Sequence, residues 1–168
     1  DAMSEIIWEE EGVAFRLPTE AEWEIAASCE KVDELTFDCS NRYIYPKQAD
    51  QCVGCITCEY VNFSGTDEYC SNIFLPIGSY NDETIYEKAT SPAGLYDMCG
   101  NAAEWVEQNR FDNNKSMARG FSYQDGDVNT TQYDLIYDED ETLTRSTIGF
   151  RSVIPAEKII QAIKESLE

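Results

Sequence analysis

Histidine is absent from this chain of 168 residues, and basic residues are scarce. Twelve Lys and Arg stand against 33 Asp and Glu, which gives a formal net charge of −21. A surface of this charge repels phosphate backbones and anionic lipid headgroups, so nucleic acid and bare membrane surfaces are not expected partners. The missing histidine removes the usual general base of Ser-His and Cys-His nucleophilic catalysis.

Long hydrophobic runs are also absent. No stretch of about 18 uncharged apolar residues occurs, so direct insertion into a membrane is not expected. The N-terminal residues Asp1–Glu5 contain neither a basic region nor an apolar core, so no export signal is visible. A chain of this length that is 42% hydrophobic predicts a single globular domain around one sizeable core.

Three motifs occur in order along the chain: Arg16-Leu-Pro-Thr-Glu-Ala-Glu-Trp-Glu24, Gly94-Leu-Tyr-Asp-Met-Cys-Gly-Asn-Ala-Ala-Glu-Trp-Val106 and Gly149-Phe-Arg151. In this order and spacing they resemble the formylglycine-generating enzyme family, also called sulfatase-modifying factor domains. The resemblance extends from Asp1 to about Val153. It implies an α+β, C-type-lectin-like fold that is rich in loops, with short strands and a few helices. In that family a segment such as Asp1–Met3 lies inside the first long helix, so we expect the N-terminal strands of the domain to be missing here.

The chain divides into two expected parts. Residues 1–154 form the sulfatase-modifying-factor-like domain, and residues 155–168 form an added amphipathic helix. The apolar stripe of that helix consists of Ile159, Ile160, Ile163 and Leu167. The helix either packs back on the domain or docks a partner or a neighbouring domain.

Local patterns predict the elements. Thr19 and Glu22 form a capping box that begins a helix, and an earlier helix ends at Gly12. The region 31–91 is expected to be dominated by loops, and the acidic run 138–141 to be a solvated loop. Strands are expected at residues 103–106, 117–123 and 147–154.

A calcium site is expected within the second motif. Calcium prefers six to eight hard oxygen ligands. The carboxylates of Asp97 and Glu104 and the carbonyls of Gly100 and Ala102 supply four, and the resemblance implies a calcium ion at these positions. The alternative is a structural role for the turn and core residues Asn101, Glu104, Trp105 and Val106. The resemblance also suggests a second, weaker calcium site that begins at Asn62 and Phe63.

Four cysteines follow the spacing C-x2-C-x2-C-x11-C: Cys52, Cys55, Cys58 and Cys70. This arrangement is able to wrap a tetrahedral zinc ion. Disulfides in an oxidising compartment and free thiols are the alternatives that the sequence leaves open. Disulfides would place the protein at the cell surface or outside the cell, and zinc would place it in the cytoplasm.

The metal ligands of the family's oxidases are absent. The resemblance implies copper held by two cysteine thiolates between the Arg-Gly-Gly-Ser-like motif and the Gly-Phe-Arg motif. Here that segment, Arg119 to Arg151, contains no cysteine, and Phe121 replaces a glycine of the motif. Copper(I) requires soft ligands, so no copper is expected. Related iron-dependent sulfoxide synthases use histidines, which this chain lacks.

The segment Tyr123–Thr147 combines tyrosines with small polar residues, a mixture typical of binding surfaces. Its candidate ligand-binding residues are Tyr123, Gln124, Asp125, Asn129, Thr131, Gln132, Tyr133 and Tyr137. Retroelement-diversified variable proteins of the resembling family place their ligand-binding residues in the matching stretch. The sequence therefore predicts a non-catalytic domain that binds a protein or glycan. The alternative is a formylglycine-generating oxidase or a related enzyme that acts on a cysteine-containing substrate.

Overall fold

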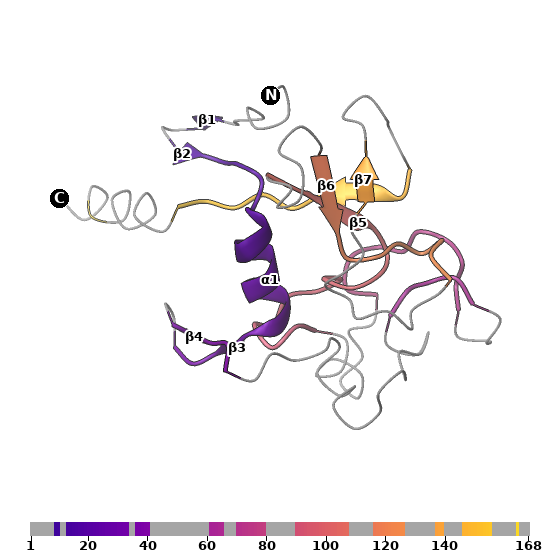
Figure 1. Ribbon diagram of the computed structural model, residues 1–168, viewed down its shortest axis with the longest axis horizontal. Helices are drawn as coiled ribbons and strands as arrows, with labels where there is room; N and C mark the ends of the chain where they lie inside the picture. The colour runs from indigo at the N-terminus through magenta and orange to yellow at the C-terminus, as the bar shows by residue number, and fades with distance from the viewer. Residues whose placement is uncertain are drawn as a thin grey trace.

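The computed structural model describes residues 9–10, 13–33, 36–40, 61–65, 70–79, 90–107, 116–126, 137–139, 146–155 and 164 (Figure 1). Within these residues the fold is an α+β arrangement with one helix of nine residues and eight short strands. None of the described residues lies in a helix that is long and apolar enough to cross a membrane.

A four-stranded sheet in the order β7-β6-β5-β8 forms the centre of the fold. Its strands are β5 (Ala103–Val106), β6 (Ser116–Arg119), β7 (Tyr137–Glu139) and β8 (Ile148–Phe150). β5 pairs antiparallel with β6 and parallel with β8, and β6 pairs antiparallel with β7. All four residues of β5 are buried, so both faces of this central strand are covered.

The helix α1 (Glu20–Ser28) lies to one side of this sheet (Figure 1). The predicted capping box is confirmed, because the Thr19 side chain accepts a hydrogen bond from the backbone N–H of Glu22 and the Glu22 side chain bonds the Thr19 backbone. Hydrogen bonds from the Arg16 side chain lower the pKa of Glu22 to about 2. The helix buries Trp23 and Ala27.

Two apolar clusters form the core. The larger cluster joins α1 to the loops and to strands β5 and β6 through Trp23, Ala27, Val61, Phe63, Met98, Cys99, Val106, Met117 and Phe121. The smaller cluster lies around Trp105 of β5 and includes Leu17, Ala103 and Ala118. Residues of β5 therefore contribute to both clusters, which fits the period-two alternation of side chains along a strand.

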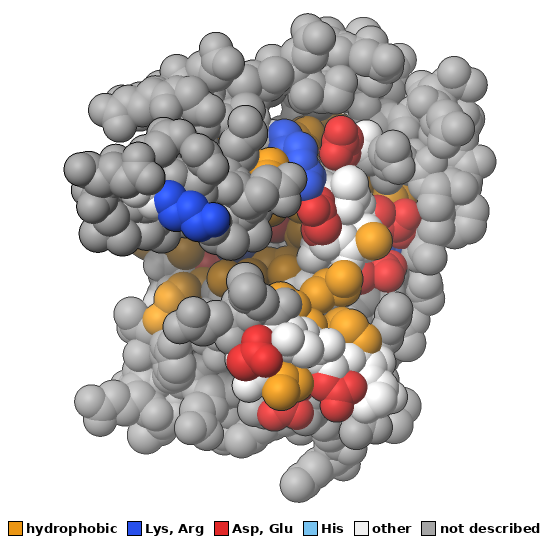
Figure 2. Space-filling model, turned by 90° about the vertical axis from the view of Figure 1, so that its left-hand side faces the viewer, with side chains coloured by type: hydrophobic (Ala, Val, Ile, Leu, Met, Phe, Trp, Pro, Cys, Tyr) orange, Lys and Arg blue, Asp and Glu red, His pale blue; other side chains and the backbone are white. Residues whose placement is uncertain are grey.

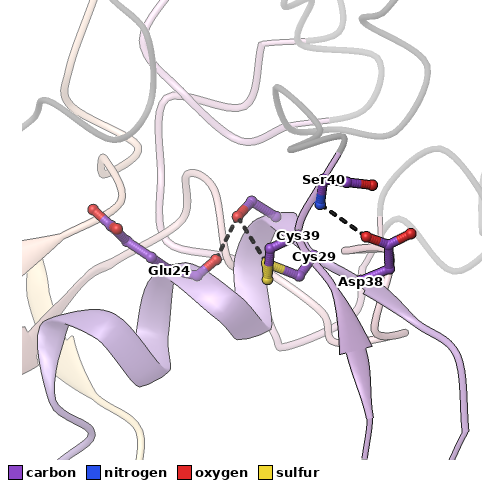
Figure 3. The surroundings of a disulfide bond; sticks show 6 residues. Glu24, Cys29, Asp38, Cys39 and Ser40 are labelled. Carbon is purple, nitrogen blue, oxygen red and sulfur yellow. Dashed lines mark hydrogen bonds between the residues drawn. A yellow bond between two sulfur atoms is a disulfide. The ribbon is translucent and has the colours of Figure 1, made fainter.

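Two short hairpins flank α1. Strands β1 (Glu9–Glu10) and β2 (Val13–Ala14) pair before the helix, and β3 (Glu30–Lys31) and β4 (Phe37–Asp38) pair after it. A disulfide between Cys29 and Cys39 closes the second hairpin at its base (Figure 3). Figure 3 also shows the Ser40 N–H donating to Asp38 beside this disulfide.

Several predicted boundaries are wrong. The helix predicted to end at Gly12 does not extend over Glu9–Glu10, because these residues pair with Val13–Ala14 as strands, and the rest of that prediction, residues 1–8, lies outside the described residues. The strand predicted over 117–123 ends at Arg119, since Gly120 adopts a positive φ of 71° that breaks the extended backbone. The strand predicted over 147–154 is shorter, spanning Ile148–Phe150, with an isolated bridge from Val153 to Arg16.

The prediction of a loop over the acidic run 138–141 is wrong for two residues, because Asp138 and Glu139 belong to β7 and pair with β6. The strand predicted at 103–106 is confirmed. The C-terminal helix lies outside the described residues except for Lys164, which is helical.

On the face that Figure 2 shows, acidic side chains of the described residues lie beside apolar ones.

Candidate functional site

The carboxylate of Glu104, in β5 and the second motif, accepts hydrogen bonds from one side chain of each of the other two motifs. The indole Nε1 of Trp23 donates to Glu104 Oε2 at 2.8 Å. Arg151 donates through Nη2 to Oε1 at 2.8 Å and through Nε to Oε2 at 3.1 Å. The motifs that are far apart in the sequence are therefore joined by one buried carboxylate.

The Glu104 and Arg151 side chains form a largely buried ion pair, with relative exposures of 11% and 28%. Arg151 also donates to the backbone carbonyl of Tyr96 at 2.9 Å. This bidentate geometry matches the fork of a guanidinium to the two oxygens of a carboxylate. Because each charge is satisfied by the other, the pair holds the end of β8 against β5.

A second buried arginine lies beside Glu104 in the sheet. Arg119 of β6 is opposite Glu104 in the register, is fully buried and forms ion pairs with Glu20 and Glu24 of α1. Its guanidinium carbon also lies 5.7 Å from the ring centroid of Trp23. Charged residues of the sheet therefore fix the position of α1.

An amide network fixes the loops beside β5. Asn62 Nδ2 donates to Asn101 Oδ1 at 2.9 Å and to the Ile73 carbonyl at 2.8 Å. Asn101 Oδ1 accepts from the Leu75 N–H, and Asn101 Nδ2 donates back to the Leu75 carbonyl. The Asn101 carbonyl accepts from the N–H of Tyr123 at 3.1 Å. This buried network ties three loops, including the start of the predicted binding segment, to one point.

The turn that precedes β5 has an unusual backbone. Asp97, Gly100 and Asn101 all have positive φ, at 53°, 77° and 66°. A Cβ atom at Gly100 would lie 2.5 Å from the Asn62 carbonyl oxygen. The turn therefore requires glycine at position 100 for both its conformation and its close approach to Asn62.

The four predicted calcium residues lie along this turn and the start of β5. Both oxygens of Glu104 accept hydrogen bonds from Arg151, and Asp97 Oδ2 accepts from the Gly78 N–H at 2.9 Å. Calcium binding at these residues stays a prediction of the sequence.

The residues of the second, weaker calcium prediction are engaged in packing. The Asn62 side chain belongs to the amide network, and its Oδ1 also accepts from Ser71 Oγ at 2.7 Å. Phe63 is buried and packs edge-on against Phe121, with centroids 6.3 Å apart. Within the described part of the chain, no group of three or more Cys, Asp or Glu side chains is placed to hold a metal ion.

The cysteines separate into different states. Cys70 is disulfide-bonded, so its sulfur is not available as the fourth thiolate of the predicted zinc site. Cys52, Cys55 and Cys58 lie outside the described residues. For Cys70 the disulfide alternative holds, and the four-thiolate set is corrected accordingly. The pair Cys29 and Cys39 forms a disulfide that the spacing pattern did not identify, and Cys99 is a buried free thiol.

A pocket of about 250 Å³ opens beside the Glu104 and Arg151 pair. Asp97, Glu104 and Arg151 supply its charged groups, and Phe74, Ile77 and Phe150 supply its apolar walls. Burial raises the pKa of the Asp97 carboxyl, although the hydrogen bond from Gly78 and the charge of Arg151 oppose this shift. The pocket thus combines a desolvated carboxylate with apolar surface.

The predicted binding segment starts next to this pocket. Tyr123 is half-buried and packs edge-on against Phe74, with ring centroids 6.4 Å apart. Gln124 is exposed and donates through Nε2 to the Tyr123 hydroxyl. The Asp125 carboxylate instead closes a turn, because its Oδ2 accepts from the backbone N–H and the hydroxyl of Ser122. Tyr123 and Gln124 are thus presented on a firmly held turn.

The other predicted binding residues are only partly described. Tyr137 lies in β7, opposite Ala118 of β6, and therefore belongs to the sheet edge. The remaining four, Asn129, Thr131, Gln132 and Tyr133, lie outside the described residues.

Sequence reasoning missed the apolar residues around the pocket. Phe74, Ile77 and Phe150 have relative exposures of 55%, 80% and 66%, unusually high for large hydrophobic side chains. Their signal in the sequence is the short apolar run Ile73–Ile77 inside an otherwise polar region, together with the central residue of the Gly-Phe-Arg motif. Grouped exposed apolar residues of this kind mark interaction sites.

The short strands, the long loops, the well-capped helix α1 and the three joined motifs define a C-type-lectin-like protein. The chain matches, over residues 1–156, the family described as the sulfatase-modifying factor enzyme 1-like domain. It therefore belongs to the FGE-sulfatase family.

Solved structures of similar fold include variable protein 1 of Treponema denticola, with a TM-score of 0.55 and 21% identity over 86% of this chain. CarF superposes with a TM-score of 0.51 and 27% identity over 85% of the chain. PvdO from Pseudomonas aeruginosa gives a TM-score of 0.55 and 19% identity over 85% of the chain. These likenesses support the fold.

In sequence, the chain is 39% identical over 95 residues to the serine/threonine-protein kinase pkn1 of Chlamydia caviae, a match that covers 56% of this chain. The match covers only 11% of the kinase. The chain also spans 49%, 48% and 53% of the three solved structures, which is about half of their length. The activities of these larger proteins are therefore not carried over to this chain.

Proposed function

We propose that this chain is a non-catalytic ligand-binding domain that binds a protein or glycan through the segment 123–147 and the adjoining surface. The observation that carries this proposal is the position of Tyr123. Its backbone N–H is bonded to the Asn101 carbonyl of the buried network, while its ring contacts the exposed ring of Phe74. A rigidly mounted tyrosine beside exposed apolar area gives contact surface at low conformational cost.

The similarity in fold to a variable protein supports a binding role. The absence of any cysteine between Arg119 and Arg151 argues against the family's copper chemistry, because the thiolates that hold copper(I) have no equivalent there. A finer proposal is that the chain is a retroelement-diversified variable protein. A reverse-transcriptase gene beside this gene, with a template repeat that matches the codons for 123–147, would support that finer proposal.

The disulfide bonds support an oxidising compartment for this domain. Disulfide bonds persist in oxidising environments and are rare in reducing cytosol. Cys29 and Cys39 are bonded to each other and Cys70 is disulfide-bonded. We therefore propose that the domain lies at the cell surface or outside the cell.

A paired experiment tests the function. The purified domain is screened against a random peptide display library and a glycan array, and the selected ligands are measured again with Tyr123→Ala. We expect ligand affinity to fall by about tenfold or more if Tyr123 is a hot spot. The matched control is Phe37→Ala, which removes an exposed aromatic ring from β4 and should leave affinity unchanged. Failure of both screens, or equal affinity of Tyr123→Ala and the unchanged protein, would remove the support for this surface.

The enzyme alternative has its own measurement. The copper-loaded domain is incubated with a cysteine-containing sulfatase peptide, and the peptide mass is followed. We expect no change in mass, because the chain has no thiolate pair at the required positions. Conversion of the cysteine to formylglycine would establish the oxidase instead.

A further inference from the structure

The segment Ile73–Ile77 presents large hydrophobic side chains to solvent. Phe74 and Ile77 have relative exposures of 55% and 80%, and Phe74 contacts the half-buried ring of Tyr123. Apolar surface in contact with water favours a partner that covers it. We call Phe74, Ile77 and Tyr123 the loop surface. None of these three residues is a predicted calcium ligand, so a ligand on the loop surface and a calcium ion do not compete for the same side chains.

Internal hydrogen bonds occupy much of the backbone of this segment. The Ile73 carbonyl accepts from the Asn62 side chain at 2.8 Å. Leu75 exchanges two hydrogen bonds with the Asn101 side chain, one through its N–H and one through its carbonyl. The segment is therefore held in place without a partner, and it offers side chains instead of backbone groups for recognition. A surface held in this way loses little conformational entropy when a ligand binds.

The polar side chains around the loop surface are also engaged. Glycan hydroxyls that are removed from water need hydrogen-bond partners on the protein. Bonds within the chain already use the side chains of Asn62, Ser71, Asn72, Asn101, Ser122 and Asp125. The surface that is left is mainly apolar, and large apolar side chains are supplied by polypeptides instead of glycans. The loop surface therefore favours a polypeptide ligand.

Charge selects among polypeptides. No charged residue occurs from Ser71 to Asn81, and acidic pairs flank this stretch in the sequence at 67–68 and 82–83. The whole chain carries a formal net charge of −21. A centre depleted in charge within a more polar surround is the usual anatomy of a protein interface. A partner with basic residues around its apolar ones is attracted to this chain, whereas an acidic partner is repelled.

We propose that the loop surface binds a protein partner through large apolar side chains that are flanked by lysine and arginine. The apolar side chains of the partner cover Phe74 and Ile77 beside Tyr123, and its basic residues are attracted by the negative charge of the chain. This inference rests on the proposed ligand-binding function. It narrows the ligand from a protein or glycan to a basic polypeptide with an apolar contact face.

The test uses three peptide display libraries of equal size and a glycan array, with calcium present throughout. The first library combines Lys with Leu, Phe and Tyr. The second replaces the apolar residues by Ser and Thr, and the third replaces Lys by Glu. We expect binders from the first library only. Binders solely from the second or third library, or solely from the glycan array, would overturn the proposal.

Serine variants locate the contact. Ile77→Ser removes an exposed side chain and leaves the hydrogen bonds of the segment in place, so the variant should fold. We expect it to bind peptides of the first library about fivefold or more weakly, as truncation of an interface anchor does. The matched control is Val32→Ser, which removes an aliphatic side chain of 63% relative exposure between β3 and β4 and should bind as the unchanged protein does. Equal affinities of the two variants would count against the loop surface.

A comparison with Tyr123→Ala separates this inference from the proposed function. If the selected ligands need Tyr123 but bind Ile77→Ser as tightly as the unchanged protein, the binding function stands and the loop surface fails. If peptides of the first library need Ile77 but bind Tyr123→Ala normally, the apolar contact at the loop stands and the proposed binding segment fails.

Discussion

Glu104 connects the three sequence motifs of this chain through its hydrogen bonds. It stands in the fully buried strand β5 and accepts hydrogen bonds from Trp23 of α1 and Arg151 beyond β8. A buried carboxylate without partners would carry a large desolvation cost. The two partners therefore explain why a glutamate is stable at a position with the burial of a core residue.

Loss of Arg151 tests this role. Arg151→Met keeps most of the side-chain volume but leaves the Glu104 charge without its cation. We expect the free energy of unfolding to fall by about 2–3 kcal/mol, below the range of about 3–5 kcal/mol for fully buried pairs because Arg151 keeps some solvent exposure. Chemical denaturation gives the value. The control is Arg16→Met, which breaks a pair with the more exposed Glu22 and should cost about 0.2–1 kcal/mol. Similar losses in both variants would show that Glu104 behaves as a surface charge.

Asp97 gives a prediction that depends on pH. Its pKa is raised in the folded protein by burial, so the charged carboxylate disfavours the folded state at neutral pH. The folded state binds the proton more tightly than the unfolded state, and this contribution to stability is lost as the pH rises through the folded pKa. In the presence of a chelator, we therefore expect Asp97→Asn to unfold at a higher temperature than the unchanged protein at pH 7, with a difference that shrinks as the pH is lowered. A lower unfolding temperature for the variant at pH 7 would contradict this account of Asp97.

Calcium supplies a third test at this scale. If Asp97 and Glu104 bind calcium, as the sequence predicts, we expect a chelator to lower the melting temperature of the purified domain. A tightly bound ion that recognises only the folded state raises stability by a few kcal/mol through linkage. Glu104→Gln should abolish the difference, and an unchanged melting temperature in chelator would contradict the calcium site.

At the scale of elements, the turn before β5 positions both the sheet and the pocket. Gly100 approaches the Asn62 backbone, and Asn101 bonds the loops that carry Leu75 and Tyr123. The loops of this fold are thus held by a few buried polar contacts instead of long regular elements. This arrangement gives a firm base for exposed residues such as Phe74.

A pair of glycine variants measures the importance of this packing. Gly94 and Gly100 both have positive φ, but a Cβ atom at Gly94 would meet no atom within 4 Å. We expect Gly94→Ala to cost about 1–2 kcal/mol from backbone strain alone. Gly100→Ala should cost about 1–3 kcal/mol more, because its Cβ atom overlaps the Asn62 carbonyl. Equal unfolding free energies for the two variants would mean that the two loops separate easily.

The sequence predicts some of these elements better than others. The capping box at Thr19 and strand β5 follow from local patterns, and both are confirmed. Glu104 and Arg151 are 47 residues apart, and their pairing depends on the parallel contact of β5 with β8, which no local pattern specifies. The exposure of Phe74 and Ile77 likewise depends on how the loops fold, because an apolar run by itself predicts burial.

At the scale of the whole molecule, a strongly acidic domain presents a localised apolar surface. This surface consists of Phe74, Ile77, Phe150 and the adjoining Tyr123. The family supplies the scaffold, and the chain lacks the cysteines of the family's copper site between Arg119 and Arg151. We propose that this surface binds the ligand.

The most direct test of this central claim is an NMR map of the binding site. A peptide or glycan selected by the library screens is titrated into the isotope-labelled domain, and changes in the backbone amide signals are assigned to residues. The account predicts that the changes cluster at Phe74, Ile77, Tyr123 and Phe150, around one continuous surface. Changes confined to the hairpin β3–β4 or to α1, with the signals of Tyr123 and Phe74 unmoved, would contradict it.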